Sequence, residues 1–257
     1  MVSRELKVVY RPWEKGRHPV TPASKPLISV IIPVLNEARV LPHTLAGLPP
    51  APDLEVVVVD GGSTDASREV AAAFSHLRLL KAPRGRGRQM NAGAAAARGE
   101  ILAFLHADTQ LTPAHLAALR QVAADPSFAA GAFWLGLTPV GPALRLIAWG
   151  ANLRCRLLGL PYGDQVLILR RSLFRSLGGF AHRRLEDLDL VLRARRYTRL
   201  RLLAPPVATS GRRWTAEGYF TTTLKNWLTL VHHLAERTFT HRWPRQGALT
   251  ELAGGGG

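Results

Sequence analysis

The sequence predicts an α/β protein with a mostly parallel sheet flanked by helices. Two apolar runs, LISVII at residues 27–32 and EVVVVD at 55–60, lack the alternation of a half-exposed strand, which is typical of strands buried on both faces. Segments of helical character separate such runs, and glycines with small polar residues follow them. Strands that alternate with helices of about ten residues form parallel sheets with right-handed crossovers.

The first half of the chain follows this alternation. Strands are expected at 27–32, 55–60, 77–82 and 100–108, with helices at 38–48, 63–76 and 88–99 between them. Ser63 or Thr64 is a candidate N-cap of the second helix, because a hydroxyl there can accept a bond from an unpaired backbone N–H. Residues 1–25 mix charges with Pro and Gly and predict an extended lead-in.

The second half is less regular but predicts the same element types. Helices are expected at 112–125, 142–159, 172–180, 185–196 and 218–239, and strands at 128–137, 165–171 and 200–206. The helix at 185–196 begins in acids and ends in bases, as the helix dipole favours. We expect one domain over residues 26–245, followed by a disordered tail at 246–257 that ends in glycines.

The net charge is +16 at pH 7, and arginines concentrate between Arg170 and Arg201. This indicates either an anionic partner, such as phosphate, a membrane surface or nucleic acid, or only an arginine-rich composition. A nucleic-acid-binding module is disfavoured, because no binding motif occurs and aromatic residues do not alternate with the arginines.

The sequence predicts a cytoplasmic protein. Its first residues are charged throughout, so no signal peptide is expected. The longest uncharged run, 126–144, is interrupted by prolines and glycines, which argues against a membrane-spanning helix. The single cysteine, Cys155, cannot form an intramolecular disulfide and is expected to be a small buried residue.

Polar residues stand where three of the predicted strands end. Asn36 and Glu37 follow the first strand, Asp60 ends the second, and His106 and Asp108 end the fourth. Ligands bind beyond the carboxyl ends of parallel strands, although each of these residues could alternatively only cap the next helix. Asp108 is a candidate ligand of Mn²⁺ or Mg²⁺, whereas His106 taken alone is more typical of a structural histidine.

The segment RGRGRQM contains Gly85 and Gly87, which imitate a dinucleotide-binding fingerprint. Met90 occupies the position of the third glycine, so the dehydrogenase interpretation loses its main support. The arginines of this segment, Arg84, Arg86 and Arg88, precede a helix N-terminus. They predict either a diphosphate site or a solvated basic loop.

Five segments, taken in order, resemble the family 2 glycosyltransferases of the GT-A fold. They are SVIIPVLNE, VVVVDGGSTD, RGRQMNAGAAAARGEILAFLHAD, LEDLDL and SGRRW. The resemblance covers about Pro26 to Trp243 and is closest to a short bacterial subgroup in which the D-x-D triplet reads H-A-D. It implies a nucleotide-sugar half at 26–110 and an acceptor half at 111–245.

The resemblance also implies roles for particular residues. Asp187 matches the general base, Asp108 matches the acid that holds a divalent metal, and His106 replaces the first acid of D-x-D, which leaves the number of protein ligands open. The implied nucleotide-sugar contacts are Pro33, Glu37, Asp60, Gly61, Arg88, Asn91, His106 and Asp108, and those to the acceptor or diphosphate are Glu186, Arg212, Arg213 and Trp214. Because Glu186 and Asp187 are adjacent on a helix, their side chains should diverge by about 100°, so that only one faces the cleft.

The leading hypothesis is an inverting, metal-assisted glycosyltransferase that uses a nucleotide-diphosphate sugar, with a UDP-sugar favoured. The alternative is a nucleotidyl- or phosphosugar-transferring α/β enzyme. Aromatic and basic residues at 212–245 suit an anionic membrane interface, or they only pack in the core. We therefore expect an unidentified acceptor that could be lipid-linked, and a location in the cytoplasm that could include the inner face of the membrane.

Overall fold

The computed structural model describes residues 28–138, 141–181 and 185–210. One eight-stranded sheet runs through these residues in the order β3-β2-β1-β4-β7-β6-β8-β5. Its strands are β1 (Ile28–Val34), β2 (Leu54–Asp60), β3 (Arg78–Lys81), β4 (Ile101–Phe104), β5 (Thr109–Gln110), β6 (Ala130–Thr138), β7 (Leu167–Arg170) and β8 (Arg201–Ser210).

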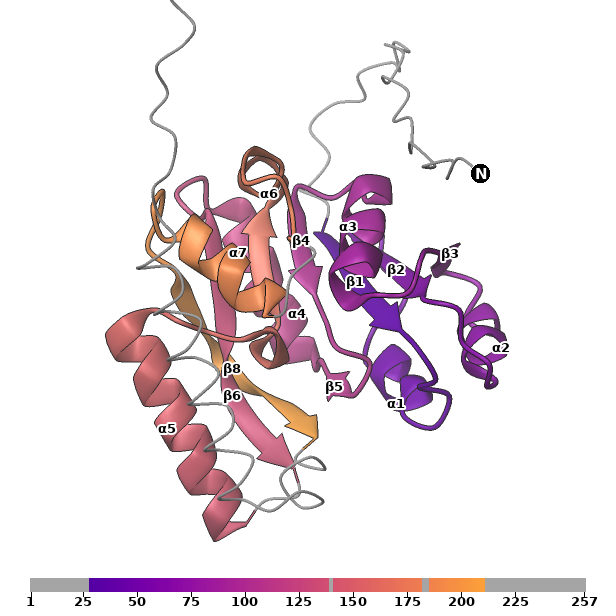
Figure 1. Cartoon of the computed structure of the whole chain (residues 1–257), viewed down its shortest axis with the longest axis horizontal. Coiled ribbons are helices and arrows are strands. Elements are labelled where there is room, and N and C mark those ends of the chain that lie inside the picture. Colours follow the sequence, from indigo (N-terminus) through magenta and orange to yellow (C-terminus); the bar gives the residue numbers. More distant parts are fainter. Residues whose placement is uncertain (1–27, 139–140, 182–184, 211–257) are drawn as a thin grey trace, which may run out of the picture.

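Helices cover both faces of this sheet (Figure 1). They are α1 (Leu41–Ala46), α2 (Ser67–Ala72), α3 (Arg86–Ala96), α4 (Pro113–Ala124), α5 (Pro142–Leu158), α6 (Arg171–Ser176) and α7 (Glu186–Ala194), and a 3₁₀ turn, η1, spans Gly163–Gln165. In the described parts of the chain, no helix is both long and apolar enough to cross a bilayer.

The continuous apolar runs of the first strands exist because both faces of the sheet are covered. In β1, Val30 and Ile32 join the apolar cluster that contains the buried residues of α1 and α4. Ile31, between them, joins the cluster on the other face, where α3, α6 and α7 pack. Apolar residues therefore face both sides of the strand, as predicted, while the one polar residue, Ser29, is buried and donates its hydroxyl to Glu55. The α/β class is confirmed.

The sheet is mostly parallel, as expected. The β3, β2, β1 and β4 strands run parallel, and so do β6 and β8. The β7 strand is antiparallel to both of its neighbours, and β5 is antiparallel to β8. The carboxyl ends of β1, β2 and β4 therefore lie at one edge of the sheet.

Two of the element boundaries that differ from the prediction affect the site. The strand expected at 100–108 ends at Phe104, and the chain then turns so that Thr109 N–H donates to His106 C=O at 3.1 Å. His106 and Asp108 are therefore not two residues of one strand face. The helix expected at 88–99 begins at Arg86, because Gly85 adopts a φ of 136° that is accessible to glycine and turns the chain into the helix.

Several predicted features lie outside the described residues. They are the lead-in at 1–25, the helix at 218–239, the tail at 246–257, and the candidate residues Arg212, Arg213 and Trp214. Cys155 lies within α5 and is buried, as expected.

Candidate functional site

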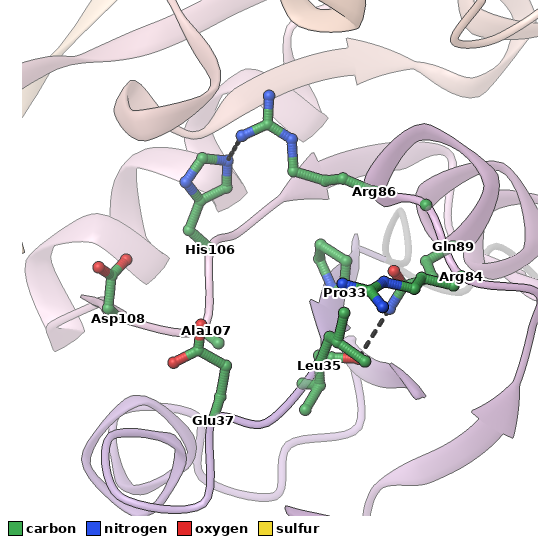
Figure 2. A pocket seen from close by; sticks show the side chains of 11 residues that line it. Pro33, Leu35, Glu37, Arg84, Arg86, Gln89, His106, Ala107 and Asp108 are labelled. Atoms are coloured by element: carbon green, nitrogen blue, oxygen red, sulfur yellow. Dashed lines mark hydrogen bonds between the residues drawn. The ribbon is translucent and has the colours of Figure 1, made fainter. Parts of the chain in front are cut away.

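A cavity of about 400 Å³ opens at the sheet edge where β1 and β4 end. Three segments line it: the end of β1 with the loop after it, the start of α3, and the turn after β4. Its lining residues are Pro33, Val34, Leu35, Glu37, Arg84, Gly85, Arg86, Gln89, His106, Ala107 and Asp108. Figure 2 shows carboxylates on one side of the cavity and two arginines on the other, so the cavity offers both metal-binding and anion-binding groups.

The loop that carries Glu37 is fixed by the polar segment after β2. Backbone N–H of Asn36 donates to Ser63 Oγ at 3.0 Å, and that of Glu37 donates to Ser67 Oγ at 2.8 Å. Ala38 N–H donates to a carboxylate oxygen of Asp65 at 3.0 Å. The serines and acid of GGSTDAS therefore hold one wall of the cavity in place.

Gln89 ties the floor of the cavity together. Its Nε2 donates at 2.8 Å to the backbone oxygens of both Val34 and Val59, at the ends of β1 and β2. The amide lies against Gly61, where a Cβ atom would come within 2.8 Å of Gln89 Cδ and Oε1. Gly61 is thus needed for close packing at this point.

Arg86 connects the cavity to the first turn of α7. Its Nε lies 2.7 Å from Glu186 Oε1, and its Nη2 lies 2.6 Å from Asp187 Oδ2. The Arg86 side chain is 42% exposed, whereas those of Glu186 and Asp187 are 14% and 8% exposed. Although Glu186 and Asp187 are adjacent on α7, both reach the same guanidinium, and neither is among the residues that line the cavity.

Burial dominates the electrostatics of Asp187. The pKa of its carboxyl is raised to about 6, mainly by burial. The charge of Arg86 lowers this pKa, and the charges of Glu186 and Asp164 raise it. Burial alone would lower the pKa of Arg86, but the charges of Asp187 and Glu186 raise it overall. A carboxyl with a pKa near neutrality, held in a cleft, is suited to proton transfer.

The 3₁₀ turn η1 supplies a second enclosed carboxylate, Asp164. Burial raises its pKa, against the opposing charges of Arg154 and Arg86. Within the described ranges, the buried side-chain oxygens without a hydrogen-bond partner are Oδ1 of Asp164 and Oδ1 of Asp187. Buried polar atoms are nearly always paired in folded proteins, so these two unpaired oxygens are unusual and single out the two carboxylates as candidate functional groups.

His106 and Arg86 both line the cavity, and His106 Nε2 lies 3.4 Å from Arg86 Nη1 (Figure 2). Burial and, to a lesser extent, the charge of Arg86 lower the pKa of His106 to about 3. The imidazole is therefore neutral at pH 7 and can accept a hydrogen bond from the guanidinium.

Four of the predicted nucleotide-sugar residues, Asp60, Gly61, Arg88 and Asn91, are not among the described residues that line the cavity. Asp60 accepts from the backbone N–H groups of Gly62 and Ser63 at 3.1 and 3.0 Å. Burial alone would raise its pKa, but the hydrogen bonds from Ser63 and Gly62 lower it overall. The Asn91 amide exchanges two hydrogen bonds with the Phe180 backbone. Arg88 belongs to the same helix as Arg86.

The described residues contain no group of three or more His, Cys, Asp or Glu side chains that could hold a metal ion. Asp108 lines the cavity together with Glu37 and His106. A metal bound there would have to take most of its ligands from elsewhere.

The sequence does not predict individual functions for Arg86 or Gln89. The signal for Arg86 was its place in a basic segment before a helix. Its partners, Glu186 and Asp187, are 100 and 101 residues away. Local sequence patterns do not predict contacts over such a separation.

Residues 29–148 match the sequence model of glycosyl transferase family 2. The matched residues, just under half of the chain, are similar to this family. An uncharacterized glycosyltransferase of Nostoc is 39% identical over 103 residues, which are 37% of this chain and 32% of that protein. An uncharacterized glycosyltransferase of Mycobacterium tuberculosis is 29% identical over 177 residues, 65% of this chain and 78% of that protein.

Among solved structures, the mannosyltransferase PcManGT from Pyrobaculum calidifontis, in complex with GDP-Man and Mn²⁺, is similar to this chain with a TM-score of 0.60. Its sequence is 25% identical, and the match covers 87% of this chain and 67% of that one. The described residues therefore have the expected GT-A fold.

Proposed function

We propose that the protein is an inverting glycosyltransferase that moves a sugar from a nucleotide-diphosphate sugar to an acceptor hydroxyl. One observation carries the proposal: Arg86 lines the cavity and also pairs with the buried Asp187. Inverting transfer requires cations for the departing diphosphate and a carboxylate for the acceptor proton. PcManGT, bound to GDP-Man and Mn²⁺, supports the donor class.

Residues that line the cavity, and the acids that pair with Arg86, would share these tasks. Pro33 and Glu37 would contact the base and ribose, and Arg84 and Arg86 would contact the diphosphate. Asp187 would take the acceptor proton, because burial holds its pKa at about 6. Asp60, Gly61, Arg88 and Asn91 would act mainly by shaping the loops and helix around the nucleotide. Predicted contacts to the diphosphate or acceptor are Arg212, Arg213 and Trp214.

Asp108 would hold a divalent metal, Mn²⁺ or Mg²⁺. Its carboxylate is a suitable oxygen donor for either ion, and it lines the same cavity as Arg84 and Arg86. Magnesium keeps several waters and commonly binds through one or two carboxylates and substrate phosphates, so a site with few protein ligands fits this chemistry. The metal would neutralise charge on the diphosphate.

A UDP-sugar remains the favoured donor, on the resemblance of the motifs, and the acceptor is unidentified. The alternative, a nucleotidyl- or phosphosugar-transferring enzyme, would share the nucleotide site but would not need Asp187. The products separate them: sugar transfer releases a nucleoside diphosphate, phosphosugar transfer from a nucleotide sugar releases a nucleoside monophosphate, and nucleotidyl transfer from a nucleoside triphosphate releases pyrophosphate. Nucleic-acid binding would instead weaken steeply with salt.

A screen of UDP- and GDP-sugars by calorimetry and nucleotide release, with Mn²⁺ and with Mg²⁺, tests the proposal. We expect binding and slow hydrolysis of at least one donor. Asp108→Ala should lose the metal-dependent part of this binding, while Asp189→Asn, which alters an α7 acid paired with Arg193, should retain it. Metal-dependent binding that survives Asp108→Ala in a folded protein would remove Asp108 from the metal site.

We also propose peripheral association with an anionic membrane, which would suit a lipid-linked acceptor. The α5 helix packs on β6 through Leu144 and Ala148, and its other side exposes Leu146, Trp149 and Leu157 at 67, 62 and 71%. The helix contains three arginines and no acidic residue. An exposed apolar stripe beside arginines is typical of helices that lie in a membrane interface.

Flotation with vesicles tests this association. Binding to vesicles that contain anionic lipids, but not to neutral ones, is expected, and it should weaken with salt. Trp149→Ala should reduce flotation. Trp134→Ala should not, because Trp134 belongs to β6 and is half-buried. Equal flotation with anionic and with neutral vesicles would contradict the proposal.

A further inference from the structure

Arg86 belongs to two sites at once. It lines the cavity proposed for the donor, and it bridges the two acids at the start of α7. Arg84, the other cavity arginine, has no ion pair to a described acid within 4.0 Å. Arg86 is therefore the described side chain through which the donor cavity and the proposed base contact each other.

The nitrogens of Arg86 are already directed at other groups. Nε faces Glu186, Nη2 faces Asp187, and Nη1 lies 3.4 Å from His106 Nε2. A guanidinium has five N–H donors in a fixed planar fork. Nε and Nη2 form the edge of the fork that faces the two acids. A diphosphate that binds this edge in the bidentate manner therefore competes with the acids for Arg86.

In this arrangement the carboxylate oxygens of Asp187 are not available to an acceptor hydroxyl. Asp187 Oδ2 is paired with Arg86, and Asp187 Oδ1 is buried. The lone pairs that would take a proton are therefore either occupied or enclosed while Arg86 is in this position.

We infer that Arg86 is a positioning residue that couples donor binding to the release of Asp187: the diphosphate of the donor draws the guanidinium away from the two acids. This inference rests on the proposed function. Once released, the Asp187 carboxylate loses its pairing cation and becomes a stronger base. The acceptor O–H then breaks with its proton passing to Asp187, the new O–C1 bond forms, and the bond from C1 to the diphosphate breaks.

Competition has a consequence that can be measured without knowing the acceptor. If the acids hold Arg86, removing one of their charges should free it for a nucleotide. Asp187→Asn and Glu186→Gln should each tighten binding of UDP or GDP with Mn²⁺ by about three- to tenfold, because a larger fraction of the protein has Arg86 available. Asp189→Asn, which removes a charge from the same helix but from a pair with Arg193, should change affinity by less than about twofold.

A double-mutant cycle separates this mechanism from simple loss of negative charge near an anion. The gain from Asp187→Asn should disappear in an Arg86→Ala background, and also in Arg86→Gln should the alanine variant unfold. Arg86→Lys should retain a part of nucleotide affinity, because lysine keeps the charge but cannot bridge both acids.

Two results would overturn the inference. One is unchanged nucleotide affinity in both acid variants. The other is a gain of equal size with and without Arg86, which would assign the effect to bulk charge. Failure of the parent protein to bind either nucleotide would instead refute the proposed function, and this inference with it.

Discussion

Gly163 lies so close to Asp187 that a Cβ atom placed on it would stand 2.4 Å from Asp187 Oδ2. The same atom would lie 2.9 Å from Nε2 of His106. The turn η1 thus presses its backbone against the proposed base and the neighbouring imidazole. Only glycine permits this approach, and it places the base close to Asp164 on the same turn.

Gly163→Ala should therefore damage activity more than stability. The added methyl group must displace the Asp187 carboxylate, because real Cβ atoms do not approach an oxygen so closely. We expect a loss of about 10-fold or more in kcat, since misplacing a catalytic group by about 1 Å can cost about 100-fold. Gly141→Ala is the matched control, because a Cβ there meets no atom within 4 Å. Equal kinetics for the two variants would show that Asp187 is not the base.

The pH dependence of kcat/KM should report Asp187. A base works in its deprotonated form, and burial raises the pKa of Asp187 to about 6. Activity should therefore be full above about pH 7 and fall about tenfold per pH unit below about pH 6. A profile from pH 4.5 to 8 checks this, because an acid limb near pH 4, typical of an exposed carboxylate, would exclude a buried base.

Gly61→Ala should weaken nucleotide binding through Gln89. The new Cβ would meet the Gln89 amide at 2.8 Å, and this amide joins the ends of β1 and β2. We expect a destabilisation of about 1–3 kcal/mol from overpacking and a lower nucleotide affinity. Urea unfolding and calorimetry measure the two effects.

A double variant provides the internal check on this prediction. Gln89→Ala alone loses the two hydrogen bonds, and Gly61→Ala should cost little more in that background, because the clashing group is gone. Additive losses would place the Gly61 effect elsewhere.

The sequence predicted the part of the site that depends on local patterns. Continuous β-branched runs identified β1 and β2, and the polar residues after β1 and β4 do meet in one cavity. The reason is physical: parallel neighbours in a sheet bring their carboxyl ends together, whatever the intervening helices contain.

The rest of the site depends on contacts between distant segments. Arg86 meets Glu186 and Asp187 across 100 and 101 residues, and the antiparallel placement of β7 brings η1 beside them. Neither has a periodic signature. Asp60 was predicted from its position at a strand end, but its carboxylate is satisfied by backbone N–H groups of its own loop, a geometry that sequence position does not reveal.

The most direct test of the account is the turnover of Asp187→Asn with a nucleotide sugar that the parent protein uses. Asparagine keeps the size of the side chain but cannot accept the acceptor proton. We predict that turnover falls by about 10²–10⁴, while the nucleotide dissociation constant does not rise but becomes about three- to tenfold smaller. Near-parental turnover in a folded Asp187→Asn protein would contradict the account.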